Sequence, residues 1–215
     1  MTTPLPLKIR ALVGTARVLM KLRIMPTPEK EHAKPLAHRL QRRAMRIACG
    51  PGDQTIRTRD LMVEGRGGPI PVRVYARPDF APNAPGYLVI DGGGFIDAGV
   101  DFTDYVQRGL AARTGCVVVG LSYRLAPEHP FPAGLEDCQD VLRWMAETRP
   151  QGMDGARIAV GGESAGANLA AALSIWSRDN DMPHGYLLCP RLTRTADNSL
   201  DQIAAEAMRY LGAAS

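Results

Sequence analysis

Between residues 55 and 189, the chain consists of two kinds of segment, which differ in their pattern of hydrophobic and polar residues and follow each other in turn. Short apolar runs, typical of strands buried on both faces, are separated by stretches of about ten to fifteen residues with helical spacing. The predicted strands are Thr55–Val63, Pro71–Ala76, Tyr87–Ile90, Val117–Val119, Ile158–Val160 and Tyr186–Cys189. The predicted helices are Thr103–Thr114, Leu135–Glu147 and Ala165–Arg178.

This alternation predicts the α/β class: a mainly parallel sheet covered by helices on both faces. The first two strands follow each other without an intervening helix, so we expect the sheet to begin with an antiparallel pair. No apolar run reaches the length of about eighteen residues that a membrane-spanning helix needs.

The N-terminal part has a different character. Leu7–Met25 has apolar residues at helical spacing among basic ones, and Glu29–Ala48 predicts a second basic helix. Residues 1–49 hold 11 Lys and Arg against Glu29 and Glu31, whereas the whole chain has a net charge of +4. We therefore expect a basic helical segment over residues 1–50 and an α/β core over 51–215. A solvated helix face explains the charge most simply, and attraction to phosphate or anionic lipid is the alternative.

Composition bounds the remaining possibilities. Hydrophobic residues at 45% and charged residues at 22% are ordinary globular values. The four cysteines lack any spacing suited to zinc, so we expect no metal site and read them as small hydrophobes in a reduced protein. Basic residues interrupt any apolar core in the first thirty positions, which argues against a secretory leader and favours a cytoplasmic protein.

The sharpest chemical signal is Gly162-Glu163-Ser164-Ala165-Gly166. It lies directly after a predicted strand and directly before a predicted helix, the context that makes a GxSxG pentapeptide a nucleophile elbow. In such a turn Ser164 would present its hydroxyl, while the helix N-terminus behind it offers N–H groups to an oxyanion. An N-capping serine in a glycine-rich turn is the structural alternative.

A second signal, Asp91-Gly92-Gly93-Gly94-Phe95, follows the strand Tyr87–Ile90. Three glycines let the main chain approach a substrate carbonyl closely. The N–H groups of Gly92, Gly93 and Ala165 would then form an oxyanion hole. A phosphate-binding turn is the competing interpretation, but neither a Walker lysine nor the GxGxxG spacing is present.

The stretch YRLAPEHPFPAGLED, Tyr123 to Asp137, completes a pattern. With the glycine turn and the elbow in this order, residues Pro71 to Pro190 resemble the hormone-sensitive-lipase-like (GDXG) branch of the α/β-hydrolases. The resemblance implies a serine carboxylesterase or lipase acting on short acyl esters of small molecules, without a metal or organic cofactor. It implies a helical cap over residues 1–50 and a second cap segment over 191–215, and it argues against nucleic-acid binding.

The resemblance implies roles for the residues around the nucleophile. Asp91, Gly94, Gly162, Glu163 and Gly166 would support the two turns. Asp91 departs from the family, which usually has His there to brace the glycine turn. A carboxylate could brace the turn through backbone N–H groups, but its charge beside an oxyanion would be unfavourable.

The second departure concerns the catalytic triad, which runs Ser, then Asp or Glu, then His in α/β-hydrolases. His184 is the only histidine after Ser164, and it precedes a strand on the entry side of the sheet, so we do not expect it to be the base. Neither Asp197 nor Asp201 matches the family's acid, and the acid and base stay unknown. His129 looks structural, and His32 and His38 belong to the expected cap.

The family continues with further strand–helix units after the expected cap helix Asp201–Leu211. We therefore expect a truncated chain, or a partner chain such as a second copy over the sheet edge, and weak or no hydrolysis by this chain alone. One alternative function is a receptor-like protein that binds a small molecule without catalysis. A membrane-associated lipase anchored by Leu7–Met25 is the other, although we do not expect membrane association.

Overall fold

The computed structural model describes residues 50–101, 103–180 and 185–186. The elements are β1 (Arg57–Gly65), β2 (Gly68–Ala76), β3 (Pro85–Ile90), α4 (Asp104–Thr114), β4 (Val117–Leu121), α5 (Ala133–Thr148), a 3-10 turn (Pro150–Gly152), β5 (Asp154–Gly162), α6 (Ala165–Asp179) and β6 (Gly185–Tyr186). The predicted helices over 7–25, 29–48 and 201–211 lie outside the described residues, as do the expected cap segments. The chain divides into two units, residues 1–41 and 42–215, and all described residues belong to the second.

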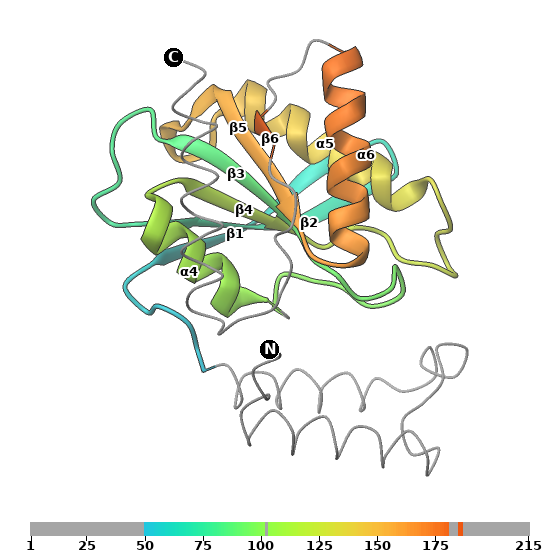
Figure 1. Cartoon of the computed structure of the whole chain (residues 1–215), viewed down its shortest axis with the longest axis horizontal. Coiled ribbons are helices and arrows are strands. Elements are labelled where there is room, and N and C mark those ends of the chain that lie inside the picture. The colour runs from blue at the N-terminus through green and yellow to red at the C-terminus, as the bar shows by residue number, and fades with distance from the viewer. Residues whose placement is uncertain (1–49, 102, 181–184, 187–215) are drawn as a thin grey trace, which may run out of the picture. The chain divides into compact units, whose positions relative to one another are not determined.

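The six strands form one sheet in the order β1-β2-β4-β3-β5-β6 (Figure 1). β1 pairs antiparallel with β2, and β2 pairs antiparallel with β4. β3 is parallel to both β4 and β5, and β5 is parallel to β6. The mainly parallel sheet with an antiparallel start is therefore confirmed.

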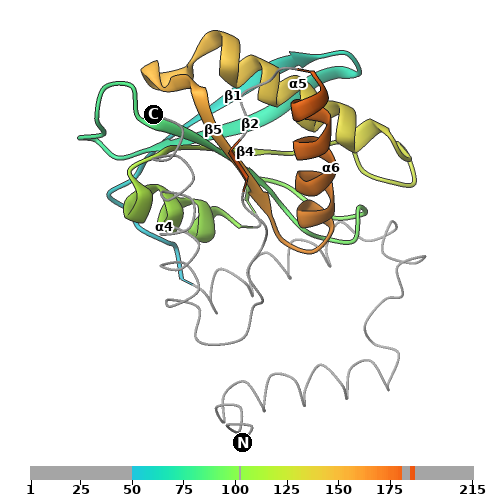
Figure 2. The same cartoon turned by 45° about the horizontal axis from the view of Figure 1, so that its top comes forward.

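Helices cover both faces of this sheet. α4 packs on β2 and β4 on one face, whereas α5 and α6 pack together against β1, β3 and β5 on the other (Figures 1 and 2). This division follows from the strand order, because β4 is reached from β3 in one direction and β5 lies on the opposite side of β3. Right-handed crossovers in opposite directions place their helices on opposite faces.

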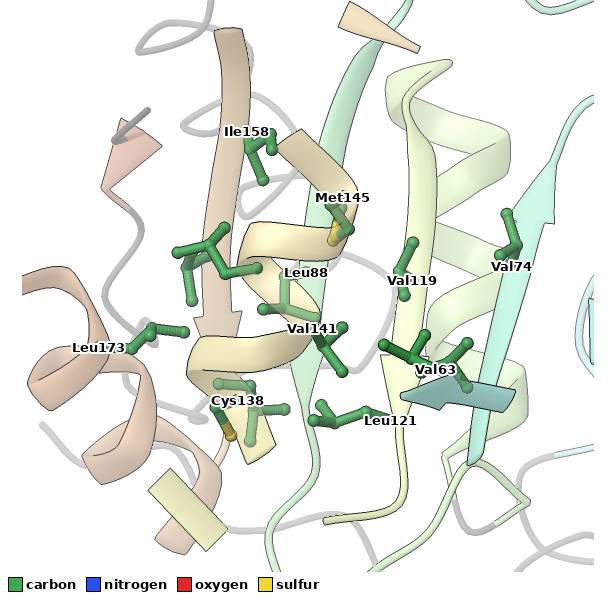
Figure 3. Packing of buried hydrophobic residues seen from close by; sticks show 14 of the residues in the cluster. Val63, Val74, Leu88, Val119, Leu121, Cys138, Val141, Met145, Ile158 and Leu173 are labelled. Carbon is green, nitrogen blue, oxygen red and sulfur yellow. The ribbon is translucent and has the colours of Figure 1, made fainter. Parts of the chain in front are cut away.

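The core follows the period of two that strands impose on side chains. Within β3, Leu88 and Ile90 belong to the hydrophobic cluster under α5 and α6, while Tyr87 and Val89 belong to the cluster under α4. Figure 3 shows the first cluster, with Val141 and Met145 on the helix α5 that crosses in front of the strands. Both faces of the central strands are therefore buried, and the turns at their ends follow directly from these buried strands.

Two of the four cysteines, Cys116 and Cys138, lie within the described residues, and both are buried. Cys116 packs in the cluster under α4 and Cys138 in the cluster under α5 and α6. Their environment agrees with the expectation that they act as small hydrophobic residues.

Candidate active site at the ends of β3 and β5

The two glycine-rich turns of the sequence leave the sheet side by side. Ile90, the last residue of β3, pairs with Gly162, the last residue of β5. Because the two strands are parallel and adjacent, the segments after them emerge at the same edge, as both views show (Figures 1 and 2). Open α/β sheets bind their ligands at such carboxyl ends, where the strand order reverses.

Ser164 stands at the turn between β5 and α6 in a strained conformation. Its φ is 49° and its ψ is −118°, a combination that L-residues other than glycine rarely adopt. The residue is exposed, and α6 begins at Ala165 directly behind it. The strand–turn–helix context predicted for the elbow is therefore present, with the serine side chain accessible.

The glycines on either side of the serine permit close packing. A Cβ at Gly166 would lie 2.0 Å from the carbonyl oxygen of Ile90, and one at Gly162 would lie 2.5 Å from the same oxygen. Any larger residue would push α6 away from the end of β3. These two glycines thus fix the position of the helix N-terminus relative to the sheet.

The glycine turn after β3 lies directly against the elbow. A Cβ at Gly92 would be 2.7 Å from the carbonyl oxygen of Glu163 and 3.1 Å from the Cβ of Ser164. Gly93 and Gly94 have φ values of 140° and 64°, which favour glycine. The N–H of Asp97 closes the turn by donating to the carbonyl oxygen of Gly93 at 3.0 Å.

The stretch from Tyr123 to Asp137, the third part of the sequence pattern, is hydrogen-bonded to the glycine turn. The hydroxyl of Tyr123 donates to the backbone oxygen of Asp91 at 3.0 Å, and the N–H of Ala126 donates to that of Phe95 at 2.9 Å. Arg124 in turn is held by the buried carboxylate of Asp137, which accepts from its backbone N–H at 2.8 Å and from its Nε at 2.9 Å. The Tyr-Arg-Leu-Ala-Pro stretch therefore holds the glycine turn at both ends, and we call its two bonds, from Tyr123 and Ala126, the clamp.

The Asp91 side chain points into the protein and only 1% of the residue is exposed. Its Oδ1 accepts hydrogen bonds from the Thr103 hydroxyl and, at 3.1 Å, from the Gln107 side-chain amide. Burial and, to a smaller extent, the nearby Glu163 carboxylate raise the pKa of Asp91 to about 7, although the hydrogen bonds from Thr103 and Gln107 favour the charged form. Side chains at the N-cap and in the first turn of α4 supply these two bonds, and the backbone N–H of Gly99 also favours the charged form of Asp91.

Sequence reasoning missed Thr103 and Gln107. Thr103 occupies the N-cap position of α4, yet its side chain makes no capping bond and serves Asp91 instead. Gln107 follows one helical turn later, so both side chains lie on one face of the helix. The sequence did contain a signal for them: two polar residues one helical turn apart, on the face of the helix that packs on the sheet, indicate a buried polar partner.

Glu163 is the second acid near the turn. Burial raises its pKa, and its Oε1 would lie 3.2 Å from a Cβ at Gly92. Both carboxyl groups flank the glycine turn, so the site disfavours two negative charges at once.

Partners for the serine hydroxyl are not found among the described residues. His129 is the only histidine in that part of the chain, and it is exposed in the loop before α5. His32, His38, His184, Asp197 and Asp201 lie outside it. The same part of the chain holds no group of three His, Cys, Asp or Glu side chains placed to bind a metal, and none of its helices is long and apolar enough to cross a membrane.

This fold and these turns have counterparts in known proteins. The model of the α/β-hydrolase fold family matches residues 87–212. The chain belongs to this family, and the resemblance to its hormone-sensitive-lipase-like esterase branch is confirmed.

Two relatives from Mycobacterium tuberculosis are esterases by name. Esterase LipI is 42% identical over 137 residues, which are 62% of this chain and 42% of the relative. Carboxylesterase NlhH is 41% identical over 140 residues, 64% of this chain and 44% of the relative. An esterase structure from Pyrobaculum calidifontis superimposes with a TM-score of 0.67 at 36% identity, covering 83% of this chain and 55% of that one. This chain thus matches less than half the length of both curated relatives.

Proposed function

We propose that the chain is the nucleophile-bearing part of a serine carboxylesterase that acts on short-chain acyl esters of small molecules. The observation that carries the proposal is the contact between the two turns. Ser164 is strained and exposed, and the position of Gly92 leaves no room for a side chain between the glycine turn and the elbow. The esterase names of the relatives agree with this chemistry.

In the proposed reaction the Ser164 hydroxyl attacks the ester carbonyl carbon and loses its proton to a general base. The carbonyl oxygen becomes an oxyanion, which accepts hydrogen bonds from the N–H groups of Gly92, Gly93 and Ala165. Collapse of this intermediate expels the alcohol and leaves an acyl-enzyme, which water then hydrolyses. The N-terminus of α6 adds the positive end of its dipole at the same place.

The glycine residues matter here for their position rather than their chemistry. Hydrogen-bond donors stabilise an oxyanion only when they are held in place before the reaction. Gly92 abuts the elbow, and the clamp through Tyr123 and Ala126 holds the turn from the other side. No metal or organic cofactor enters the proposed steps.

A second candidate is a receptor-like protein that binds an ester or similar small molecule without turnover. One observation favours it: among the described residues, the single histidine is exposed and no acid–histidine pair accompanies Ser164. The general base of the first proposal therefore has to come from outside residues 50–180.

Hydrolysis of a short-chain p-nitrophenyl ester separates the two candidates. An esterase with an oxyanion hole but an incomplete triad still accelerates hydrolysis roughly 10³-fold over water. The same residual acceleration is expected when the serine itself is missing. We therefore expect turnover by the intact chain above that level and a fall to that level in Ser164→Ala.

Ser174→Ala is the matched control, because the Ser174 hydroxyl is bonded within α6 to the carbonyl oxygen of Ala170 at 2.8 Å. It should leave turnover unchanged. Saturable binding of the ester by a folded chain that does not hydrolyse it would instead support the receptor-like candidate.

A further inference from the structure

The buried carboxyl group of Asp91 has too few hydrogen-bond donors for a negative charge. A carboxylate offers about four acceptor sites. Oδ1 receives the Thr103 hydroxyl and the Gln107 amide, while Oδ2 has no hydrogen-bond partner among the described residues. With 1% of the residue exposed, water cannot supply the missing donors freely. An ionised group in this position would be poorly solvated.

The side chains around Asp91 contain a second unsatisfied acceptor. The Oε1 atom of Gln107 is buried and, within the described part of the chain, also lacks a partner. Its amide nitrogen donates both to Asp91 and, at 3.1 Å, to the Thr103 hydroxyl oxygen. The cluster of Asp91, Thr103 and Gln107 therefore has more acceptors than donors, and a proton on Asp91 would add one donor.

The charges around Asp91 act in the same direction. Glu163 faces it from the turn between β5 and α6, and its negative charge disfavours a second one. Thr103 and Gln107 face it from α4, the Gly99 N–H from the loop before α4, and the neutral Tyr123 hydroxyl from the end of β4. None of these groups is a cation, so no neighbour compensates an ionised Asp91.

We propose that Asp91 is a positioning residue that keeps its proton well above the pH at which an exposed aspartate loses it, and that its neutral carboxyl group holds the Gly92–Gly94 turn against α4. The inference rests on the proposed function in one respect: this turn is the proposed oxyanion hole. A neutral acid can tie the turn to Thr103 and Gln107 without placing a negative charge beside a developing oxyanion. It thereby performs the bracing that histidine usually supplies at this position in the resembled family.

Carbon-13 NMR of the aspartate carboxyl groups tests the proposal in the intact chain. Between about pH 4 and pH 9 we expect one carboxyl signal with a midpoint near 7, absent in Asp91→Asn. The backbone amide signals of Gly92 and Gly93 should move with the same midpoint. The matched control is Asp101→Asn, because the Asp101 side chain is 59% exposed on the same loop, and it should retain both signals.

Thr103→Val provides a second readout should Asp91→Asn fail to fold. The Thr103 hydroxyl favours the charged form of Asp91, so its removal should raise the midpoint by on the order of one pH unit. An Asp91 midpoint in the ordinary range near 4 would overturn the proposal. Backbone amide signals of Gly92 and Gly93 that do not shift as Asp91 titrates would overturn it as well. The titration needs no substrate, so its result tests the role of Asp91 independently of whether the chain hydrolyses esters.

Discussion

Ser164 has backbone angles that only glycine adopts without cost. A residue held in such a region stores roughly 1–3 kcal/mol, which the surrounding packing must offset. We therefore expect Ser164→Gly to be more stable than Ser164→Ala by roughly 1 kcal/mol, although neither variant should hydrolyse esters. Urea denaturation of the two variants measures this difference. A less stable Ser164→Gly would mean that the turn is not strained.

Asp91 should make the stability of the fold depend on pH. Its pKa is about 7 in the folded chain against 3.8 as the ordinary value, so the folded state binds a proton that the unfolded state loses. The free energy of unfolding should then fall as the pH rises from about 4 to about 7. Asp91→Asn should remove this decline. At pH 8 its free energy of unfolding should exceed that of the wild type by on the order of 2 kcal/mol. Urea denaturation at pH 5 and pH 8 gives both values. An equal decline in both proteins would assign it to other groups.

Single residues differed in how far the sequence could predict them. The glycine turn and the elbow were predictable because their short-range patterns encode backbone geometry: Ser164 lies in its turn, and Gly92 abuts it. The bonds from Thr103 and Gln107 to Asp91 were not predicted, because they depend on how α4 docks on the sheet. Docking is a tertiary property that spacing along one segment does not determine.

At the scale of elements, the site depends on the fit between the glycine turn and the elbow. Gly92→Ala would place a Cβ 2.7 Å from the Glu163 carbonyl oxygen, so the two turns would have to separate. Displacing one oxyanion donor costs roughly 10²–10³-fold in kcat, and we expect a loss of this size in ester hydrolysis. The free energy of unfolding should fall by only about 1–3 kcal/mol.

Steady-state kinetics with a short-chain p-nitrophenyl ester, together with urea denaturation, separates the two effects of Gly92→Ala. Hydrolysis at the wild-type rate by the folded variant would contradict the proposed role of this turn. A loss of rate in a folded variant would support it.

The elements themselves were largely predictable, although some of their bounds were not: β2, for example, begins at Gly68 and not at the predicted Pro71. Continuous apolar runs identified β3 and β4, and helical spacing identified α5 and α6. β5, however, begins at Asp154 rather than at the predicted Ile158, because Asp154 pairs with Pro85 across a register shift. Asp154 and Arg157 are charged and partly exposed, and the residues between them are a glycine and an alanine, so this stretch has no apolar run that predicts a strand.

At the scale of the whole molecule, alternation of strands and helices was sufficient to predict a mainly parallel sheet covered on both faces. The strand order could not be derived from that alternation, since it depends on which crossovers reverse. The reversal is what brings the ends of β3 and β5 together and creates the site. The triad acid and base were not identified from the sequence, and no described residue takes their place beside Ser164.

The central claim is that Ser164 is an activated nucleophile, and intact-mass analysis after incubation with a fluorophosphonate tests it most directly. Such reagents react quickly only with a serine whose hydroxyl is activated by a base. The account predicts one adduct on the intact chain and none on Ser164→Ala, with Ser174→Ala labelled like the wild type. A folded chain that forms no adduct would contradict the account and leave either a chain without its general base or a binding protein on the esterase scaffold.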